Sequence, residues 1–298
     1  MPAQYIGFVH NPNRKEALDL VNRLIKTLRL GDCWVTSMDK LDVATDKLSR
    51  TSTLITAGGD GTILRSVRLA APHGIPILGI NMGRVGFMAE VEVADAIARI
   101  PEYLRDGHRV EERMMLRASV VPRKGGAPKL VVDALNDVVV SRGAVARLID
   151  VDVVIDGASL ATYRADGLIV STPTGSTGYA LSAGGPVIHP EMQCLFVQPI
   201  AAHISLQTGI LADRDSILEL SVAEGEAVLM SVDNITVTPV GPDDKVIIGR
   251  SPFVARFLRE APPSAFYANL TRRLGVKAQT TPRRRSPDDG PATAGGPQ

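Results

Sequence analysis

Residues 58–62 read Gly-Gly-Asp-Gly-Thr and lie between an apolar run typical of a buried strand and the start of a helical pattern. Glycines let the backbone approach a ligand closely, and the first turn of a helix presents unpaired N–H groups to an anion. The segment therefore predicts a phosphate-binding loop. Beside a phosphate, Asp60 is unfavourable unless it accepts a proton from an attacking hydroxyl or helps to hold Mg²⁺ on the phosphates. The alternative is a plain turn with Asp60 as a cap, but three glycines exceed what a cap needs.

A second stretch, residues 166–179, combines an apolar run with a loop crowded with hydroxyl side chains and glycines. Small hydroxyls and open backbone amides suit hydrogen bonding to a nucleoside, and Tyr179 could flank a base. A surface turn rich in Ser and Thr is the alternative. Asn136 and Asp137 form a third candidate, because an amide beside a carboxylate at a strand start could clamp a ribose diol. Taken alone, this pair is also what a strand-edge turn contains.

Several common sites are excluded by the same residues. The loop at 58–62 lacks the Gly-Lys-Ser/Thr ending of a P-loop and does not match Gly-x-Gly-x-x-Gly. Ser176 is not in the Gly-x-Ser-x-Gly elbow of a serine hydrolase. The five histidines have no metal-ligand spacing, so no metal-binding residue is predicted.

The elements that must position these residues change character along the chain. The first hundred residues alternate strand-like and helix-like runs, which predicts an α/β domain with a mainly parallel sheet. The expected strands are 5–9, 53–57 and 75–80, and the expected helices are 14–30, 62–71 and 93–106. After about Val110, short β-rich runs and the hairpin signals at Asp156-Gly157 and Glu224-Gly225 predict a second, all-β, sandwich-like domain.

The expected domain organisation has four parts. They are an α/β phosphate-donor domain at 1–108, a β-rich dinucleotide-binding domain at 109–255, a closing segment at 256–277 and a disordered tail at 278–298. The closing segment contains a helix at 264–274, expected to pack on the first domain. The tail is rich in Pro and Gly and carries an Arg cluster at 283–285.

Composition excludes several classes of protein. Among the 298 residues, 45% are apolar, and 33 Lys and Arg balance 32 Asp and Glu. A net charge of +1 argues against nucleic acid as a partner. No run reaches the ~18 apolar residues of a membrane span, and the N-terminus lacks the pattern of a signal peptide. Two distant cysteines suggest no disulfide framework. The chain is therefore predicted to be cytoplasmic, without a membrane partner.

Taken together, the motifs resemble those of the NAD kinases, over roughly residues 6–275. The motifs that carry the likeness are 58–62, 79–87, 134–137, 166–179 and 184–186. The first is shared with diacylglycerol-type lipid kinases and, more loosely, with phosphofructokinases. Lipid kinases usually continue with Asn-Glu, whereas residues 63–65 here are Ile-Leu-Arg. The motif at 166–179 is far more specific to NAD kinases.

The resemblance implies transfer of a phosphoryl group from ATP or polyphosphate to the 2′-hydroxyl of the adenosine ribose of NAD, which gives NADP. It implies Asp60 as the proton acceptor, Mg²⁺ or another divalent cation with the donor, and a homodimer or homotetramer. The residues that match ligand-binding positions of the family are Gly58, Gly59, Gly61, Thr62, Arg65, Phe87, Asn136, Asp137, Arg147, Arg164, Asp166, Thr177, Gly178, Tyr179, Ser182 and Ala201.

By this resemblance, Asn136 and Asp137 bind the adenosine, and Asp166 meets the nicotinamide side. The sequence departs from the family at a few positions. Asp137 stands where many members have Glu, and Gly178 replaces a frequent Ala. Ile235 occupies the place of a frequent Gln, so that residue's contact does not carry over.

Two alternative functions remain open at this point. One is a lipid or other small-molecule kinase that shares only the glycine loop; the motif at 166–179 argues against it. The other is a non-catalytic dinucleotide-binding sensor, which would not need the carboxylate of Asp60. The sequence does not decide between ATP and polyphosphate, or between NAD and NADH.

Overall fold

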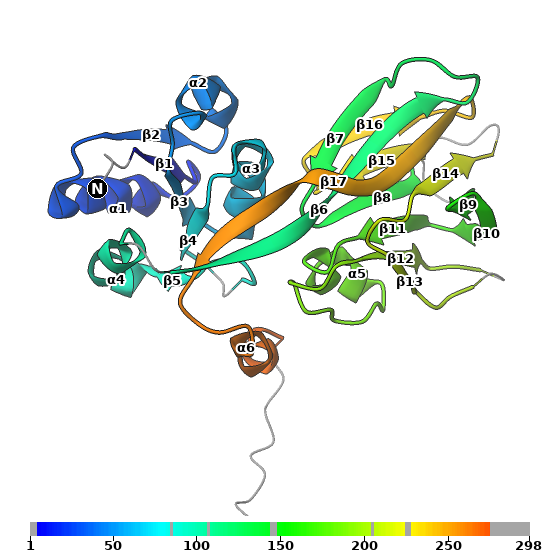
Figure 1. Ribbon diagram of the computed structural model, residues 1–298. Coiled ribbons are helices and arrows are strands. Elements are labelled where there is room, and N and C mark those ends of the chain that lie inside the picture. Colours follow the sequence, from blue (N-terminus) through cyan, green and yellow to red (C-terminus); the bar gives the residue numbers. More distant parts are fainter. Residues whose placement is uncertain are drawn as a thin grey trace, which may run out of the picture. The chain divides into compact units, whose positions relative to one another are not determined.

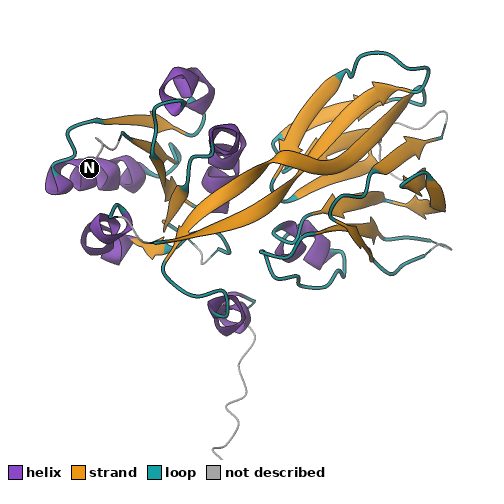
Figure 2. Ribbon diagram, viewed as in Figure 1, coloured by secondary structure: helices purple, strands orange, loops and turns teal. Residues whose placement is uncertain are grey.

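The computed structural model describes residues 5–83, 86–105, 108–143, 148–203, 206–223 and 228–274. It divides into two compact units, residues 1–260 and 261–298. The described strands belong to the first unit (Figures 1 and 2).

The N-terminal part of the first unit is an α/β arrangement. Its parallel strands run in the order β4-β3-β1-β2, and β5 extends β4. The strands are β1 (Ile6–His10), β2 (Cys33–Ser37), β3 (Thr53–Gly58), β4 (Ile77–Asn81) and β5 (Val91–Glu92). The α-helices are α1 (Lys15–Leu28), α2 (Thr45–Leu48), α3 (Asp60–Ala70) and α4 (Ala96–Tyr103); 3-10 turns are η1 (Leu41–Ala44), η2 (Ala71–His73) and η3 (Val93–Asp95). The mainly parallel sheet is as predicted.

Local sequence explains most of these elements. Helix α1 buries Ala17, Leu20, Val21 and Leu24, the i, i+3, i+4, i+7 stripe of an amphipathic helix. Strand β3 is buried along its whole length, which matches its apolar run. Helix α3 starts at Asp60, two residues before the predicted start, so Asp60 belongs to its first turn. Strand β2 has only one fully buried residue and was not predicted.

Two long strands continue from this sheet into the β-rich part (Figure 1). They are β6 (Arg109–Pro122) and β17 (Asp244–Arg259), paired antiparallel along nearly their full length. Strand β17 pairs with β4 at one end and with β14 at the other. Residue 255, where the predicted β-rich domain ends, thus lies inside a continuous strand, and the two parts share one sheet.

A second, antiparallel sheet packs on the first to form the predicted sandwich. Its strand order is β13-β12-β11-β8-β15-β16. The remaining strands are β7 (Leu130–Ala134), β8 (Asp137–Arg142), β9 (Ile149–Ile155), β10 (Ala158–Ala165), β11 (Gly167–Ser171), β12 (Cys194–Ile200), β13 (Ile210–Asp213), β14 (Leu218–Val222), β15 (Val228–Val232) and β16 (Thr236–Val240). One buried cluster joins the sheets, with Tyr163 and Leu220 from the first and Val140 from the second.

The hairpin predicted at residues 156 and 157 joins β9 to β10, with positive φ values of 50° at Asp156 and 80° at Gly157. The second hairpin signal, Glu224-Gly225, lies outside the described residues. Helix α6 (Ala265–Arg273), in the second unit, falls where a closing helix was predicted; its packing on the first domain stays a prediction. The predicted tail, including the Arg cluster, lies outside the described residues. Within the described ranges, no helix is both long and apolar enough to cross a membrane.

Candidate active site

The glycine loop forms a tight strand-to-helix connection. Strand β3 ends at Gly58, Gly59 is the cap residue in extended conformation, and α3 begins at Asp60. A Cβ on Gly58 would lie 2.2 Å from the Thr62 hydroxyl oxygen, so a side chain there would collide with the first helical turn. By contrast, nothing lies within 4 Å of a Cβ built on Gly59 or Gly61. The loop therefore leaves an open, amide-rich surface at the helix start, suited to an anion.

The carboxylate of Asp60 is held by the loop that follows β4. The backbone N–H of Phe87 donates to Oδ2 at 3.0 Å, and that of Met88 donates to Oδ1 at 3.3 Å. A Cβ on Gly86 would lie 2.2 Å from Oδ1, so this loop can approach the carboxylate only with glycine at that position. The structure thus joins two of the sequence motifs, and it uses the main chain of Phe87 to orient Asp60.

The two residues of the third motif meet the hydroxyl-rich loop: Asn136 lies in the connection between β7 and β8, and Asp137 is the first residue of β8. Thr172 donates through its hydroxyl to the Leu135 carbonyl at 2.6 Å and through its N–H to the Asn136 carbonyl at 2.8 Å. The Ser171 hydroxyl also donates to the Asn136 carbonyl, at 3.1 Å. A Cβ on Gly175 would lie 2.2 Å from the same carbonyl oxygen. The two segments are therefore packed main chain against main chain.

This packing changes the interpretation of the hydroxyl-rich loop. Ser176 donates to the Pro173 carbonyl at 2.6 Å and accepts from the Ile188 N–H at 2.9 Å. The hydroxyls of Ser171, Thr172 and Ser176 thus shape the loop and are not free for a ligand, contrary to a role for the whole loop in binding. The accessible residues lie on the turn η4 (Gly175–Thr177) and helix α5 (Tyr179–Ser182), where Gly178, Tyr179 and Ser182 are exposed and Thr177 is half-buried.

A cavity of about 470 Å³, here called the Tyr179 pocket, brings these segments together. Its lining residues are Leu64, Asn136, Asp137, Val139, Ser141, Tyr179, Ser231, Asp233 and Asn234. Leu64 belongs to α3, one turn after Asp60, which is about 6 Å along the helix axis. One helix therefore carries the predicted base and also forms part of this pocket's wall.

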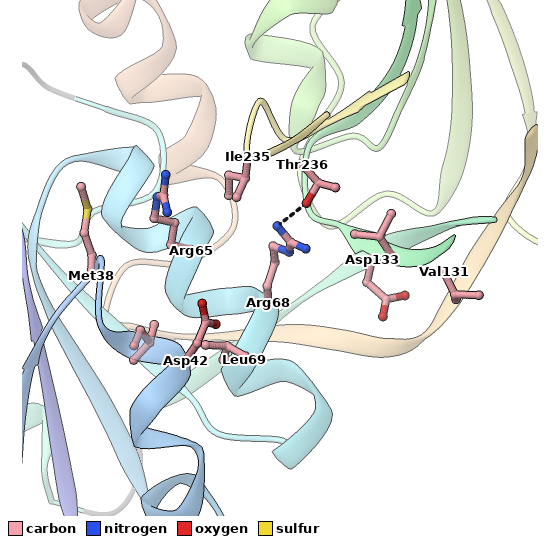
Figure 3. Close-up of a pocket in the computed structure, with 11 residues that line it drawn as sticks. Met38, Asp42, Arg65, Arg68, Leu69, Val131, Asp133, Ile235 and Thr236 are labelled. Atoms are coloured by element: carbon pink, nitrogen blue, oxygen red, sulfur yellow. Dashed lines mark hydrogen bonds between the residues drawn. The ribbon is translucent and has the colours of Figure 1, made fainter. Parts of the chain in front are cut away.

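A second cavity of about 420 Å³, here called the Arg65 pocket, lies beside the same helix (Figure 3). It is lined by Met38, Leu41, Asp42, Arg65, Arg68, Leu69, Val131, Val132, Asp133, Ile235 and Thr236. Arg68 donates to the Thr236 hydroxyl at 3.0 Å (Figure 3). The connection between β15 and β16 contributes Asp233 and Asn234 to the Tyr179 pocket and, with Thr236 at the start of β16, Ile235 to the Arg65 pocket. This turn therefore borders both cavities.

Burial dominates the electrostatics of the Tyr179 pocket. Asp137 is only 8% exposed, and burial, together with the nearby carboxylate of Asp233, raises its pKa to about 7. Burial also raises the pKa of Asp233, although backbone amides and Arg68 oppose the shift. The buried side-chain oxygen of Asn136 has no hydrogen-bond partner among the described residues. A neutral polar ligand with hydroxyl groups would provide a donor for that oxygen.

Other predicted residues lie at the opposite end of the same strands. Asp137 pairs with Ser171 at one end of β8 and β11, and Ser141 pairs with Gly167 at the other, about 13 Å away along the strands. Asp166 lies just before β11, and its Oδ1 is 3.2 Å from Arg142 Nε, an ion pair. Arg164 and Ala201 are exposed nearby: the Arg164 carbonyl accepts from His203, and Ala201 follows β12. Arg147 lies outside the described residues. The described ones form a second group, at the Ser141 end of the Tyr179 pocket lining.

Asp233 and Arg68 are the residues that the sequence analysis missed. Asp233 and Asn234 have positive φ values of 50° and 53° and, with Ile235, form the three-residue hairpin connection between β15 and β16. Asp-Asn between two β-rich runs was the available signal for the turn. Nothing in the sequence showed that the Asp233 side chain reaches residues almost a hundred positions earlier.

Comparison with known proteins agrees with this geometry. Models of the ATP-NAD kinase N-terminal and C-terminal domains match residues 32–108 and 135–260. A NAD kinase of Symbiobacterium thermophilum is 44% identical over 222 residues, 74% of this chain and 77% of the relative. One from Dehalococcoides mccartyi is 37% identical over 271 residues, 90% of this chain and 95% of the relative.

Two solved structures are similar over nearly the whole chain. An Archaeoglobus fulgidus NAD kinase in complex with ATP has a TM-score of 0.73 and 26% identity, covering 91% of this chain and 99% of that one. Yeast NADH kinase complexed with NADH has a TM-score of 0.83, covering 95% and 91% of the two chains, and at 21% identity it supports the fold alone. With both domain models matched and full-length relatives above 30% identity, this chain belongs to the ATP-NAD kinase family.

Proposed function

We infer that this protein is a NAD kinase, which transfers a phosphoryl group from ATP to the 2′-hydroxyl of the adenosine ribose of NAD. The observation that carries this inference is the position of helix α3. It starts at Asp60 in the glycine loop and continues as a wall of the Tyr179 pocket. A base and a nucleoside-sized cavity on one helix are what phosphoryl transfer to a ribose hydroxyl requires.

The Tyr179 pocket is our proposed acceptor site. Asn136 and Asp137 present an unpartnered amide oxygen and a buried carboxyl group, which suit ribose hydroxyls and the polar edge of a base. Tyr179 is 47% exposed, so its ring is available to cover a base. Thr177, Gly178 and Ser182 lie on the same short segment and complete the proposed adenine site.

The glycine loop and the Arg65 pocket are our proposed donor site. The loop residues Gly59, Gly61 and Thr62 surround the start of α3, where phosphates are favoured. Arg65 and Arg68 extend the positive charge along the helix to the Arg65 pocket. We propose that the donor's phosphate chain runs from the glycine loop towards these arginines.

In the proposed step, Asp60 accepts the proton of the 2′-hydroxyl. The 2′-oxygen forms a bond to the terminal phosphorus as the bond from that phosphorus to its bridging oxygen breaks, and ADP leaves with the electron pair. A carboxylate has about four acceptor positions, so the two amides on Asp60 leave it able to take the proton. Those amides also fix the direction in which the carboxylate points.

A divalent cation fits this site as a companion of the donor. Among the described residues, no group of three or more His, Cys, Asp or Glu side chains is arranged to hold a metal ion. Mg²⁺ commonly binds through substrate phosphates and water with few or no protein carboxylates, so it would be held mainly by the donor's phosphates at the glycine loop, which leaves Asp60 available as the base. Bound there, the cation would neutralise charge on the phosphates.

The decisive experiment is an assay for NADP with Mg²⁺-ATP and NAD, and in parallel with polyphosphate and NAD. We expect NADP with ATP; the second reaction tests polyphosphate as a donor. Asp60→Asn should lower kcat about 10²- to 10⁴-fold, the usual contribution of a general base. It should leave NAD binding measured by calorimetry within a few fold. Undiminished turnover by this variant would contradict the role of Asp60.

If folded wild-type protein makes no NADP with either donor, retained NAD binding would favour the sensor, and phosphorylation of diacylglycerol would favour the lipid kinase. The second group of predicted residues, Arg164, Asp166 and Ala201, remains a proposed nicotinamide-side site. A homodimer or homotetramer and a cytoplasmic location likewise stay predictions. Light scattering and cell fractionation test them directly.

A further inference from the structure

The side chain of Asp233 caps the main chain that carries Asn136 and Asp137. Its Oδ2 accepts from the Leu135 N–H at 2.8 Å, and its Oδ1 accepts from the N–H groups of Asn136 at 2.8 Å and Asp137 at 3.1 Å. The Asp233 N–H in turn donates to the Asp137 carbonyl at 3.0 Å. Asp233 is 5% exposed, so these bonds form away from water.

The opposite side of the same turn is held by the loop after β11. Thr172 occupies the carbonyls of Leu135 and Asn136, as described above. The donors and acceptors of the turn's main chain are therefore used internally. What remains for a ligand is the side chains of Asn136 and Asp137, whose directions depend on this main-chain geometry.

The capping residue is also linked to the helix that carries the base. Asp233 begins the connection between β15 and β16, Thr236 is the first residue of β16, and Arg68 of α3 donates to the Thr236 hydroxyl at 3.0 Å (Figure 3). The charge of Arg68 also acts on Asp233, where it favours the ionised carboxylate. A single hairpin turn thus contacts both α3 and the turn at residues 135–137.

We propose that Asp233 is a positioning residue for the acceptor substrate, which fixes Asn136 and Asp137 in the orientation that binds the adenosine ribose, while Arg68 ties its hairpin turn to helix α3. The proposal rests on the proposed NAD kinase function and adds a residue to its acceptor site. Asp233 acts through the main chain of its neighbours and takes no part in the transfer of the phosphoryl group.

The chain contains a matched control. Asp156 also has φ of 50° at the first position of a hairpin turn, and its carboxylate accepts from the Ile217 N–H at 2.8 Å and the Ser216 hydroxyl at 2.8 Å. Its own N–H donates to the Ile217 carbonyl at 3.0 Å, as that of Asp233 does to Asp137. Asp156 therefore makes the same kind of capping contacts at the β9–β10 hairpin, outside both pockets.

The test compares Asp233→Asn with Asp156→Asn by steady-state kinetics. An asparagine offers one acceptor oxygen and sets an NH₂ group against backbone donors. We expect Asp233→Asn to raise KM for NAD about 10- to 100-fold, the equivalent of hydrogen bonds to a charged group, with kcat within about 3-fold. KM for ATP should stay the same, and Asp156→Asn should change neither KM.

A pH profile separates positioning from a general loss of structure. The charged groups that act on this pair are Asp137 on β8, Asp233 on the hairpin turn and Arg68 on α3. Removing the charge of Asp233 should move the inflection of NAD affinity with pH to lower pH. Asp156→Asn should leave this inflection where it is in the wild type.

Thr236→Val is a second variant in case Asp233→Asn does not fold. It removes the acceptor for Arg68 without leaving a buried charge unpaired, and we expect KM for NAD to rise about 2- to 5-fold. An unchanged KM for NAD in folded Asp233→Asn, or in Thr236→Val if the first variant is unfolded, would overturn the proposal. A wild-type protein that makes no NADP would instead contradict the proposed function, and NAD binding by calorimetry would then test Asp233.

Discussion

Two carboxylates of the proposed active site lie in opposite environments. Asp60 is half-exposed at the start of α3 and accepts two backbone N–H groups from the loop after β4. Asp137 is buried at the start of β8, next to the buried Asp233, and its pKa is raised to about 7. Burial beside another carboxylate favours the neutral form of Asp137. The same type of side chain is thus oriented by main-chain amides as the proposed base in one region. In the other region it is buried, where it can share hydrogen bonds with a neutral ligand.

The largest effect, on kcat, is expected from displacing the carboxylate of Asp60. Gly86→Ala would place a Cβ 2.2 Å from Asp60 Oδ1, so either the loop or the carboxylate must move. We expect kcat to fall about 100-fold, as when a general base is displaced. NAD affinity by calorimetry should be unchanged. Gly31→Ala is the control, because nothing lies within 4 Å of its added Cβ; a Gly86→Ala enzyme as active as this control would show that the contact with Gly86 is unimportant.

The next prediction concerns the stability effect of Asp137. Its raised pKa means that the folded state holds this proton up to about pH 7, whereas the unfolded chain releases it near pH 3.8. Wild-type stability from this group is therefore full below about pH 4 and is lost as pH rises to about 7. Asparagine does not titrate, so Asp137→Asn does not lose stability in this pH range. The unfolding free energy of the variant minus that of the wild type should therefore be about 2–3 kcal/mol larger at pH 8 than at pH 5. Urea unfolding at the two pH values measures the difference.

Asp156→Asn is the control for that measurement, since hydrogen bonds from Ile217 and Ser216 lower the pKa of Asp156. Its contribution to stability is lost as pH falls, so this variant should show no gain on going from pH 5 to pH 8. An equal pH dependence in the two variants would contradict the assigned environment of Asp137.

A smaller effect on KM for NAD is expected from disturbing the packing of Gly175 against the main chain of Asn136, next to Asp137. Gly175→Ala would place a Cβ 2.2 Å from the Asn136 carbonyl oxygen, where two main chains are packed together. We expect about 1–3 kcal/mol of destabilisation and a KM for NAD raised about 10-fold. Gly241→Ala, whose added Cβ lies no closer than 3.6 Å to a neighbour, should alter neither quantity. A Gly175→Ala enzyme with wild-type KM and melting temperature would count against this packing.

The surroundings of Asp60 could be predicted from the sequence more fully than those of Asp137. The glycine loop and the strand and helix around it were predicted almost to the residue, because periodicity and glycine placement are local signals. The contact between Phe87 and Asp60 joins residues 27 apart, and it depends on the parallel pairing of β3 with β4, which no local pattern specifies.

The Asp137 side was predicted only in part. The Asn-Asp pair and the hydroxyl-rich loop were identified, but the inward direction of Ser171, Thr172 and Ser176 follows from the pairing of β11 with β8. Asp233 was missed because its partners lie 96–98 positions away in the chain. Such capping contacts depend on which strands are neighbours, so they become visible only once the sheet order is known.

The smallest expected effect is a change in KM for ATP when a charge in the Arg65 pocket is removed. It tests whether donor and acceptor bind in separate cavities. Arg65 lies on α3 between Leu64, which lines the Tyr179 pocket, and Arg68, which lines the Arg65 pocket. Its side chain is exposed, so water and salt screen its charge. Arg65→Ala should raise KM for ATP about 3- to 10-fold, as expected for one solvent-exposed charge facing a phosphate chain, and the effect should shrink at high ionic strength.

Asp42→Asn removes a negative charge from the same pocket and should lower KM for ATP slightly, while neither variant should change KM for NAD. The opposite signs matter, because a general disturbance of the pocket would raise KM for ATP in both variants. If Arg65→Ala instead raised KM for NAD and left that for ATP alone, the donor would have to approach the glycine loop from another side. Asp60 would keep its role in that case, because its orientation depends on the loop after β4 and not on the Arg65 pocket.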